Sequence, residues 1–319
     1  MIIKILVANL FFIIVPLQAQ QRVIFDTDID SDVDDVGALA MLYHLHNQSR
    51  IHLLGVIVTS DDPYAPTCVS VLNRHYGFEE LPIGFLENQP TLTNHSRYTK
   101  QLTEEFPRKL ELWQDAVPAT QLYRRLLADS PDHSVIIVTV GHLSSLQNLL
   151  CSPADQNSPL DGKALVEAKV QAWYCMGGQY PEGKEANFYR PDPESTVYCL
   201  NNWTKPVIFC GWETGNLVIT GGKYLQTNLD SKHPVYSAYQ LYNNFRGRAS
   251  WDQLTVYLLT GDAEKYFLFE NQGWCTVEAN GSNRWVAGEK MNHSYMKFKP
   301  DADIPKLEKE IDDLMINFR

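Results

Sequence analysis

Six aspartates within ten consecutive positions are the strongest chemical signal in this sequence: Asp26, Asp28, Asp30, Asp32, Asp34 and Asp35. The short apolar run from Val23 to Phe25 precedes them. Apolar residues at helical spacing follow from Val36 to Tyr43, so the acids are predicted on a strand-to-helix turn. Like charges this close repel one another unless a cation offsets them. Because all the ligands are oxygen atoms, the pattern favours a hard divalent cation, Ca²⁺ or Mg²⁺.

Other kinds of aspartate-rich segment fit the sequence less well. An EF-hand loop needs Gly at its sixth position and Glu at its twelfth, but a loop starting at Asp28 places Val33 and Leu39 there. A phosphotransferase of the haloacid dehalogenase type also uses Asp-x-Asp after a strand. Its usual Gly-Thr is missing here, and the further acids would repel a phosphate. An acidic turn that is only exposed to solvent is disfavoured, because the buried strand before it would hold the acids close together at its end.

The elements that must position these acids are predicted from hydrophobic patterns. Four further strands are expected at 52–58, 134–140, 170–175 and 206–210, each ending in a polar or glycine-rich loop. Helices are expected at 68–76, 119–127, 146–150 and 304–317, and residues 81–102 are predicted as a loop. This alternation predicts an α/β fold with a mostly parallel central sheet and helices on both faces. Ligands bind outside the carboxyl ends of parallel strands, so the loops are expected to form one shared site.

Composition limits the class of protein and its partners. The chain has 319 residues, of which 44% are hydrophobic and 20% charged, which suits one large domain over residues 20–319. The net charge of −11 argues against nucleic acid and anionic membranes as partners. The six cysteines are too widely spaced to indicate a disulfide framework or a metal-binding pair. Those beside apolar runs, Cys175 and Cys210, are expected to be buried free thiols.

The first 19 residues have the layout of a secretory signal peptide. One Lys precedes an apolar core from Ile5 to Val15, and Pro16 and Ala19 follow. The apolar core is short for a membrane span. The protein is therefore expected to be secreted or periplasmic, without membrane attachment once residues 1–19 are removed.

The aspartate cluster resembles the hallmark of the nucleoside hydrolase family, in particular its inosine- and uridine-preferring type. That hallmark is Asp-x-Asp, a short gap, and Asp-Asp at the start of a helix. The matching residues are Asp26-Thr27-Asp28 and Asp34-Asp35. The gap is longer than in the shortest family form and is similar to that of secreted bacterial members. The resemblance extends from residue 22 to about residue 260. It implies an open, Rossmann-like α/β fold and hydrolysis of the N-glycosidic bond of ribonucleosides to free base and ribose.

A metal site follows from the same resemblance. From the residues alone, Asp252 is equally well explained as an acid interacting with the dipole at a helix start. The resemblance implies instead that Asp252 completes a metal shell with Asp28, Asp35 and the backbone carbonyl of Val140, which precedes the segment 141–145. Carboxylates, one carbonyl and water favour Ca²⁺ over Zn²⁺.

Residues that bind the substrate are also implied by the resemblance. On their own, segments 176–178 and 184–188 would be explained as a glycine-bearing surface loop with ordinary polar residues. Their similarity to family segments implies that Glu185 and Asn187 hold ribose hydroxyls and that Met176 lines the pocket. Asp34 would hydrogen-bond the sugar beside the metal. Asp62, after the second strand, corresponds loosely to a further substrate-binding position.

The implied mechanism is direct attack by a metal-bound water, with inversion at the sugar carbon. The sugar acquires oxocarbenium character, which nearby carboxylates stabilise, while the metal orients the water and lowers its pKa. Asp28 is the expected general base. Many family members carry a His before the late Asp to help the base depart, whereas this chain has Trp251. An indole N–H has no useful acidity, so Trp251 is expected to stack on the base or to wall the pocket.

Trp251 keeps a second hypothesis open, in which the protein is a secreted Ca²⁺-dependent nucleoside- or sugar-binding protein without catalysis. A small-molecule nucleoside is the expected partner in either case, and the preferred base stays open. The resemblance also implies a homo-oligomer, because family members commonly pair into dimers or tetramers. No sequence feature identifies an interface.

Overall fold

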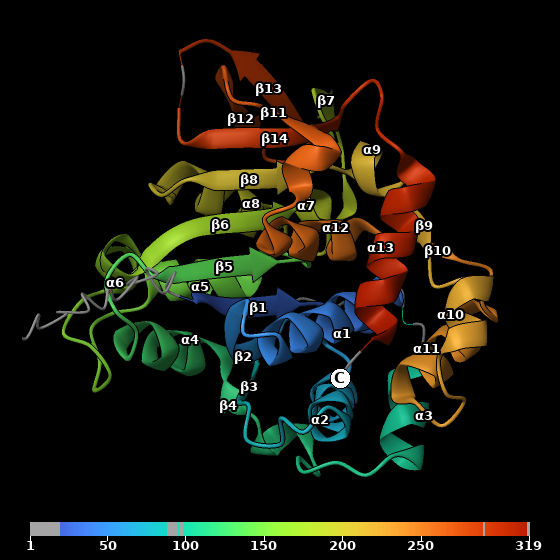
Figure 1. Ribbon diagram of the computed structural model, residues 1–319. Coiled ribbons are helices and arrows are strands. Elements are labelled where there is room, and N and C mark those ends of the chain that lie inside the picture. The colour runs from blue at the N-terminus through green and yellow to red at the C-terminus, as the bar shows by residue number, and fades with distance from the viewer. Residues whose placement is uncertain (1–19, 88–94, 96–97, 290, 318–319) are drawn as a thin grey trace, which may run out of the picture.

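A nine-stranded sheet lies at the centre of the molecule (Figure 1). This computed structural model describes residues 20–87, 95, 98–289 and 291–317, so the predicted signal peptide at residues 1–19 lies outside the described residues. All neighbouring strands in the sheet run parallel except β11 and β14. In order across the sheet the strands are β11 (Phe267–Glu270), β14 (His293–Phe298), β8 (Val207–Cys210), β6 (Val170–Met176), β5 (Val135–Thr139), β1 (Gln21–Thr27), β2 (Ile51–Val58), β3 (Ile83–Phe85) and β4 (Val117–Pro118).

Helices cover both faces of this sheet, and each face has its own apolar core. In β1, Val23 and Phe25 contribute to one core and Ile24 to the other, because side chains alternate along a strand. A parallel sheet that is buried on both faces explains why its strands have continuous apolar runs. The first core includes α1 (Asp34–Asn47), α2 (Ala65–His75), α12 (Trp251–Tyr257) and α13 (Ile304–Ile316). The second includes α4 (Ala119–Ala128), α5 (Ser144–Cys151), α6 (Gly162–Lys169) and α8 (Pro193–Asn202).

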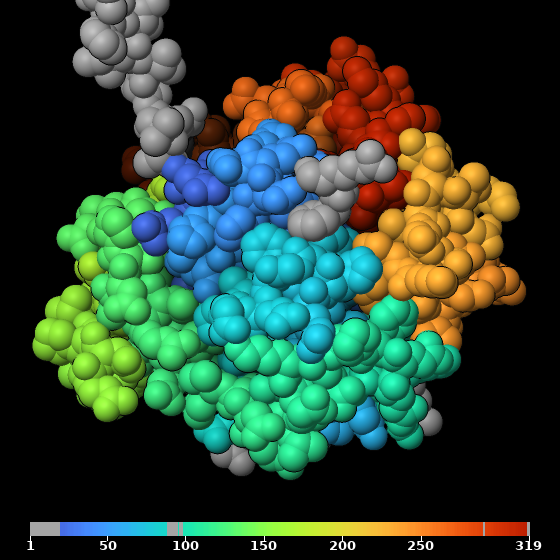
Figure 2. All heavy atoms as spheres, turned by 60° about the horizontal axis from the view of Figure 1, so that its bottom comes forward, coloured from blue at the N-terminus to red at the C-terminus, as the bar shows by residue number. Residues whose placement is uncertain are grey.

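Smaller elements surround the sheet. One small antiparallel sheet consists of β7 (Glu182–Gly183), β13 (Asn283–Ala287) and β12 (Gly273–Val277). A second pairs β9 (Ile219–Thr220) with β10 (Arg248–Ala249). The remaining α-helices are α3 (Tyr98–Glu105), α7 (Ala186–Tyr189), α9 (Trp212–Gly215), α10 (Lys223–Asn228) and α11 (Pro234–Asn243). Short 3-10 turns span Trp113–Asp115, Leu258–Thr260 and Ala263–Lys265. In Figure 2, the gold segment of α10 and α11 lies against the cyan and green segments of α2 and α3, and α11 contacts both of these helices.

The predicted fold class is confirmed, with one local error. The strands expected at 52–58, 134–140, 170–175 and 206–210 correspond to β2, β5, β6 and β8. The prediction of a loop over 81–102 was wrong where β3 and the start of α3 lie; residues 88–94 and 96–97 lie outside the described residues. A strand of three residues gives too short a pattern to be recognised, and α3 is mostly polar. All six cysteines are free, and Cys175 and Cys210 are buried as expected. Among the described residues, no helix has the length and apolarity that crossing a membrane requires.

Candidate active site and metal centre

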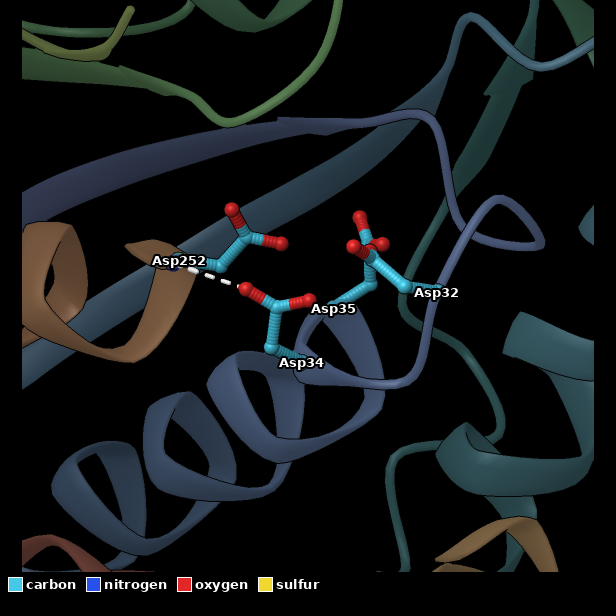
Figure 3. A group of neighbouring side chains, drawn as sticks. All are labelled: Asp32, Asp34, Asp35 and Asp252. Carbon is cyan, nitrogen blue, oxygen red and sulfur yellow. Dashed lines mark hydrogen bonds between the residues drawn. The ribbon is translucent and has the colours of Figure 1, made fainter. Parts of the chain in front are cut away.

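Four carboxylates converge at the carboxyl edge of the sheet (Figure 3). Asp32 lies in the turn after β1, Asp34 and Asp35 begin α1, and Asp252 lies in the first turn of α12. One oxygen of each lies within 4.8 Å of the others. The backbone N–H of Asp252 donates to Asp34 Oδ2 at 3.3 Å, and this bond links the two helix starts. The cluster therefore joins one end of the chain to a residue more than 200 positions later.

The packing of α1 against α12 brings the two helix starts together. At Gly37 of α1, an added Cβ would lie 2.6 Å from Gln253 Nε2 of α12, so a larger residue would require this side chain to move. The first turn of each helix carries acids, which the positive end of the helix dipole stabilises. Neither N-cap residue, Val33 of α1 or Ser250 of α12, caps its helix with its side chain, although both starts are buried. Local sequence thus supplies the acids, and helix packing supplies their convergence.

Burial makes these charges costly without a cation. It raises the pKa of Asp34, Asp35 and Asp252 well above the usual value, and the neighbouring carboxylates raise each pKa further. Asp34 Oδ1 and Asp35 Oδ2 are buried and have no hydrogen-bond partner within the described part of the chain. Two buried carboxylate oxygens without donors, within a group of four neighbouring carboxylates, fit a hard divalent cation. Asp32, Asp34, Asp35 and Asp252 are the residues that would hold it.

A cavity of about 670 Å³ opens directly above the carboxylates. Its lining combines acidic, aromatic and cationic side chains. Every predicted site residue except Asp35 and Asp62 lines this cavity. The lining residues are Asp28, Ser31, Asp32, Asp34, Val140, Met176, Glu185, Ala186, Asn187, Arg190, Pro191, Trp212, Tyr242, Arg248, Trp251 and Asp252.

Asp28, the predicted base and metal ligand, lies beside the four-carboxylate cluster and is not one of its members. Its side chain is buried against Gly141, where an added Cβ would lie 2.7 Å from Asp28 Cβ, so the loop after β5 must have glycine here. Burial and the neighbouring charges, Asp32 first, raise the pKa of the Asp28 carboxyl to about 8 in the metal-free protein. Asp28 is thus a buried carboxyl at the cavity wall. Its ionisation depends on whether a cation neutralises the neighbouring carboxylates.

Glu185 and Asn187 lie together at the start of α7. Glu185 accepts backbone N–H bonds from Asn187 at 2.9 Å and from Gly178 at 3.0 Å. Burial raises the pKa of Glu185 to about 7, and these hydrogen bonds oppose that rise. The Asn187 amide donates to the Val140 carbonyl at 2.8 Å, which is the carbonyl that the family resemblance assigns to the metal. Both residues are held rigidly at the cavity wall by backbone contacts.

The structure places Asp62 in a different pocket. That pocket measures about 310 Å³ and is lined by Asp61, Asp62, Pro63, Tyr64, His95, Thr99 and Lys100. The carboxylate of Asp62 accepts hydrogen bonds from the Thr99 hydroxyl at 2.6 Å and from the backbone N–H of Tyr64 at 3.2 Å. Asp26 is also not among the cavity-lining residues, and its carboxylate accepts a hydrogen bond from the Tyr123 hydroxyl at 2.6 Å. Asp26 and Asp62 are therefore both hydrogen-bonded to other residues of the protein.

Several residues of the site were missing from the sequence prediction, and two of them, Asp32 and Arg248, form an ion pair. Asp32 joins the carboxylate cluster, and its place in the run of alternating aspartates was a usable signal. Arg248 lines the cavity and forms an ion pair with Asp32 at 2.6 Å. Nothing in the sequence near Arg248 distinguishes it from other surface cations. Its place in the site is visible only in the structure, where β10 positions it against the aspartate turn.

Comparison with known proteins gives the class to which this fold and site belong. The model of the inosine-uridine preferring nucleoside hydrolase family matches residues 23–301. The chain therefore belongs to this family of N-glycosidases. No curated protein matches the sequence.

Solved structures share the fold at low sequence identity. A plant nucleoside hydrolase has a TM-score of 0.69 at 14% identity, with 93% of this chain and 99% of that chain covered. A purine-preferring ribonucleoside hydrolase from Gardnerella vaginalis has a TM-score of 0.69 at 13% identity, with 93% and 99% covered. The type III effector XopQ, solved with adenosine diphosphate ribose, has a TM-score of 0.66 at 14% identity, with 93% and 94% covered. At these identities the likeness shows the fold alone.

Proposed function

We propose that this protein hydrolyses the N-glycosidic bond of ribonucleosides in a Ca²⁺-dependent reaction, with direct attack of water on the sugar carbon. The observation that carries the proposal is the convergence of Asp32, Asp34, Asp35 and Asp252, three of which (Asp32, Asp34 and Asp252) also line the cavity. The all-oxygen donor set favours Ca²⁺ over softer metals. A bound divalent cation supplies positive charge that lowers the pKa of a water molecule and orients it.

Asp28 is the proposed general base. It lies in the cavity wall next to the carboxylate cluster and is buried against the loop after β5. A carboxylate there accepts the proton of the attacking water as the C–O bond forms. The ionised carboxylates around it stabilise the positive charge that develops on the sugar ring. Their negative charge also disfavours a phosphorylated sugar at this end of the cavity, since phosphate would be repelled.

The lining of the cavity offers groups for both halves of a nucleoside. Its carboxylates, with Glu185 and Asn187, offer hydrogen-bond acceptors and donors for ribose hydroxyls. Trp212, Tyr242 and Trp251 offer flat apolar surfaces for a base. This lining supports a ribose held at the carboxylates and a base held against the aromatic side chains.

Ribose release from a panel of purine and pyrimidine nucleosides tests the proposal. The protein from residue 20 onward is assayed with Ca²⁺, after EDTA treatment, and as the Asp28→Ala variant. We expect release that is lost in both of the latter samples. Asp115→Ala serves as the control, because Asp115 is exposed and remote from the cavity lining. Release that is unaffected by EDTA would contradict the metal dependence.

One observation favours a second candidate, a Ca²⁺-dependent nucleoside-binding protein without catalysis. The Trp251 indole N–H donates to the Trp212 carbonyl at 2.9 Å and is therefore committed to the protein. It is not available to a departing base. Tight nucleoside binding in Ca²⁺ without ribose release from any member of the panel would support this candidate.

We also propose that residues 1–19 are a cleaved signal peptide, that residues 20–319 form one domain, and that the protein is secreted or periplasmic. The layout of the first 19 residues supports export. N-terminal sequencing of the protein recovered from the periplasm or medium tests this. A protein that retains Met1 in the cytoplasm would contradict it.

A further inference from the structure

Arg248 occupies a fixed position between the acidic and aromatic walls of the cavity. Its Nη2 donates to Asp32 Oδ2 at 2.6 Å. Its guanidinium lies over the ring of Trp251 at 4.7 Å and near the ring of Tyr242 at 5.7 Å. The side chain is 31% exposed, and it lines the cavity. The cation is therefore anchored on one side and faces the ligand space with the other.

The guanidinium has hydrogen-bonding capacity beyond this ion pair. It carries five N–H donors. Nε is itself buried without a hydrogen-bond partner among the residues that the structure describes, so the donors that a ligand can reach are on the terminal nitrogens. Because arginine keeps its charge at all ordinary pH values, this group offers a permanent cation and not a transferable proton. It is suited to stabilising negative charge at a fixed place.

A departing nucleobase develops negative charge. When the C1′–N bond breaks, its electron pair moves onto the base, and this charge must be met by a proton or by a cation. The indole of Trp251 is not a source of protons, because its N–H is bonded to the Trp212 carbonyl. Arg248 lies against the face of the same indole. A cation beside the aromatic wall meets the charge without proton transfer.

We propose that Arg248 is the residue that stabilises the departing nucleobase, by donating hydrogen bonds to its ring nitrogen or carbonyl oxygen as the C1′–N bond breaks. This inference rests on the proposed function. Water forms the new C–O bond and gives its proton to Asp28, and the base leaves as an anion that then takes a proton from solvent. The products are ribose and neutral base, and no further reactant is needed. Asp32 has a second role as the group that positions the guanidinium.

Two substrates with different leaving groups test this assignment. Inosine needs stabilisation of its leaving base, whereas p-nitrophenyl β-D-ribofuranoside has a leaving group that departs readily without it. We expect Arg248→Met to lower kcat/KM for inosine by about 100-fold, as for loss of one preorganised donor at a site of developing charge. For the nitrophenyl riboside we expect a change below about fivefold, because sugar binding and metal binding are intact. Arg248→Lys, which keeps the charge, should recover part of the inosine activity.

The matched control is Arg246→Met. Arg246 is exposed, lies two residues before Arg248, and does not line the cavity, so both activities should stay at the wild-type level. Equal losses on both substrates in Arg248→Met would overturn the inference and assign Arg248 to the carboxylate cluster instead. Unchanged inosine activity would also overturn it. Failure of the proposed function gives a different result, in which the wild-type protein cleaves neither substrate.

Discussion

The side-chain amide of Asn187 donates a hydrogen bond to the backbone carbonyl of Val140 at 2.8 Å. The same nitrogen lies 3.3 Å from the Met176 carbonyl and 3.1 Å from its sulfur. One amide thus joins the carboxyl ends of β5 and β6 at the cavity wall. A carbonyl oxygen has two lone pairs, so this bond leaves Val140 able to contact a cation as well.

Replacing Asn187 with Ala removes the donor that these carbonyls share. We expect Asn187→Ala to lower the free energy of unfolding by about 1–3 kcal/mol, because buried acceptors lose their partner. Urea denaturation in EDTA measures this. Asn228→Ala is the matched control, since Asn228 donates to the Tyr224 carbonyl at 2.8 Å on an exposed helix surface. If the two substitutions lowered the free energy of unfolding equally, burial of the Asn187 hydrogen bonds would not be the cause of the lost stability.

Asp35 is expected to be essential for the metal. Its Oδ1 accepts a hydrogen bond from the Thr27 hydroxyl, and its Oδ2 is buried without a partner among the described residues. We expect Asp35→Asn to weaken Ca²⁺ binding by roughly 10- to 100-fold, because a charged ligand is lost. Calorimetric titration measures the affinity, with Asp115→Asn as the control at an exposed site. Wild-type affinity in Asp35→Asn would remove Asp35 from the metal shell.

Ca²⁺ is also expected to stabilise the folded protein. A ligand that binds only the folded state at 100 times its Kd adds about 2.7 kcal/mol. The Tm of the wild-type protein should therefore rise with Ca²⁺ concentration, and the Tm of Asp35→Asn should rise much less. The absence of any Ca²⁺-dependent shift in the wild-type protein would contradict a calcium site in this cluster.

The metal-free protein should lose stability as pH rises. Folding raises the pKa of Asp28 to about 8 and of Glu185 to about 7, and it raises the pKa values of Asp34, Asp35 and Asp252. A raised carboxyl pKa favours the protonated folded state, so its contribution is full below the unfolded pKa of about 4 and is lost as pH approaches the folded pKa. In EDTA, we expect a lower Tm at pH 8.5 than at pH 5.

Saturating Ca²⁺ should abolish or reverse this pH trend. The cation holds the carboxylates ionised in the folded state, so raising the pH no longer costs stability. Thermal unfolding at both pH values, with Ca²⁺ and with EDTA, makes the comparison. A Tm that increases from pH 5 to pH 8.5 in EDTA would show that the buried carboxyls do not carry these raised pKa values.

Trp251 is expected to contribute stacking and not acid catalysis. Base–aromatic stacking is worth about 1–3 kcal/mol per base on replacement by alanine, so Trp251→Ala should raise KM for nucleosides by about 5- to 150-fold. Trp251→Phe keeps an aromatic face and should raise KM less. Steady-state kinetics measure both, with Trp113→Ala as the control, because Trp113 lies outside the cavity lining. Equal KM values for Phe and Ala variants would argue against stacking.

The sequence by itself determined the elements that carry the site. The apolar run before Asp26 specifies a buried strand, and the helical spacing after Asp35 specifies the helix that follows it. The alternation of strands and helices specifies a parallel sheet, and with it the edge where ligands gather. These features were predictable because they depend on contacts between neighbours in the chain.

Only the tertiary structure decided which acids face one another and which side chains oppose them. Periodicity placed Asp28 and Asp32 on the same turn, but the packing of α1 against α12 brings Asp32 and not Asp28 into the four-carboxylate cluster. Asp62 follows a strand at the same edge, yet Thr99 of α3 draws it into a separate pocket. Arg248 meets Asp32 across 216 positions of sequence. Such contacts depend on how whole elements pack, and no local pattern records that packing.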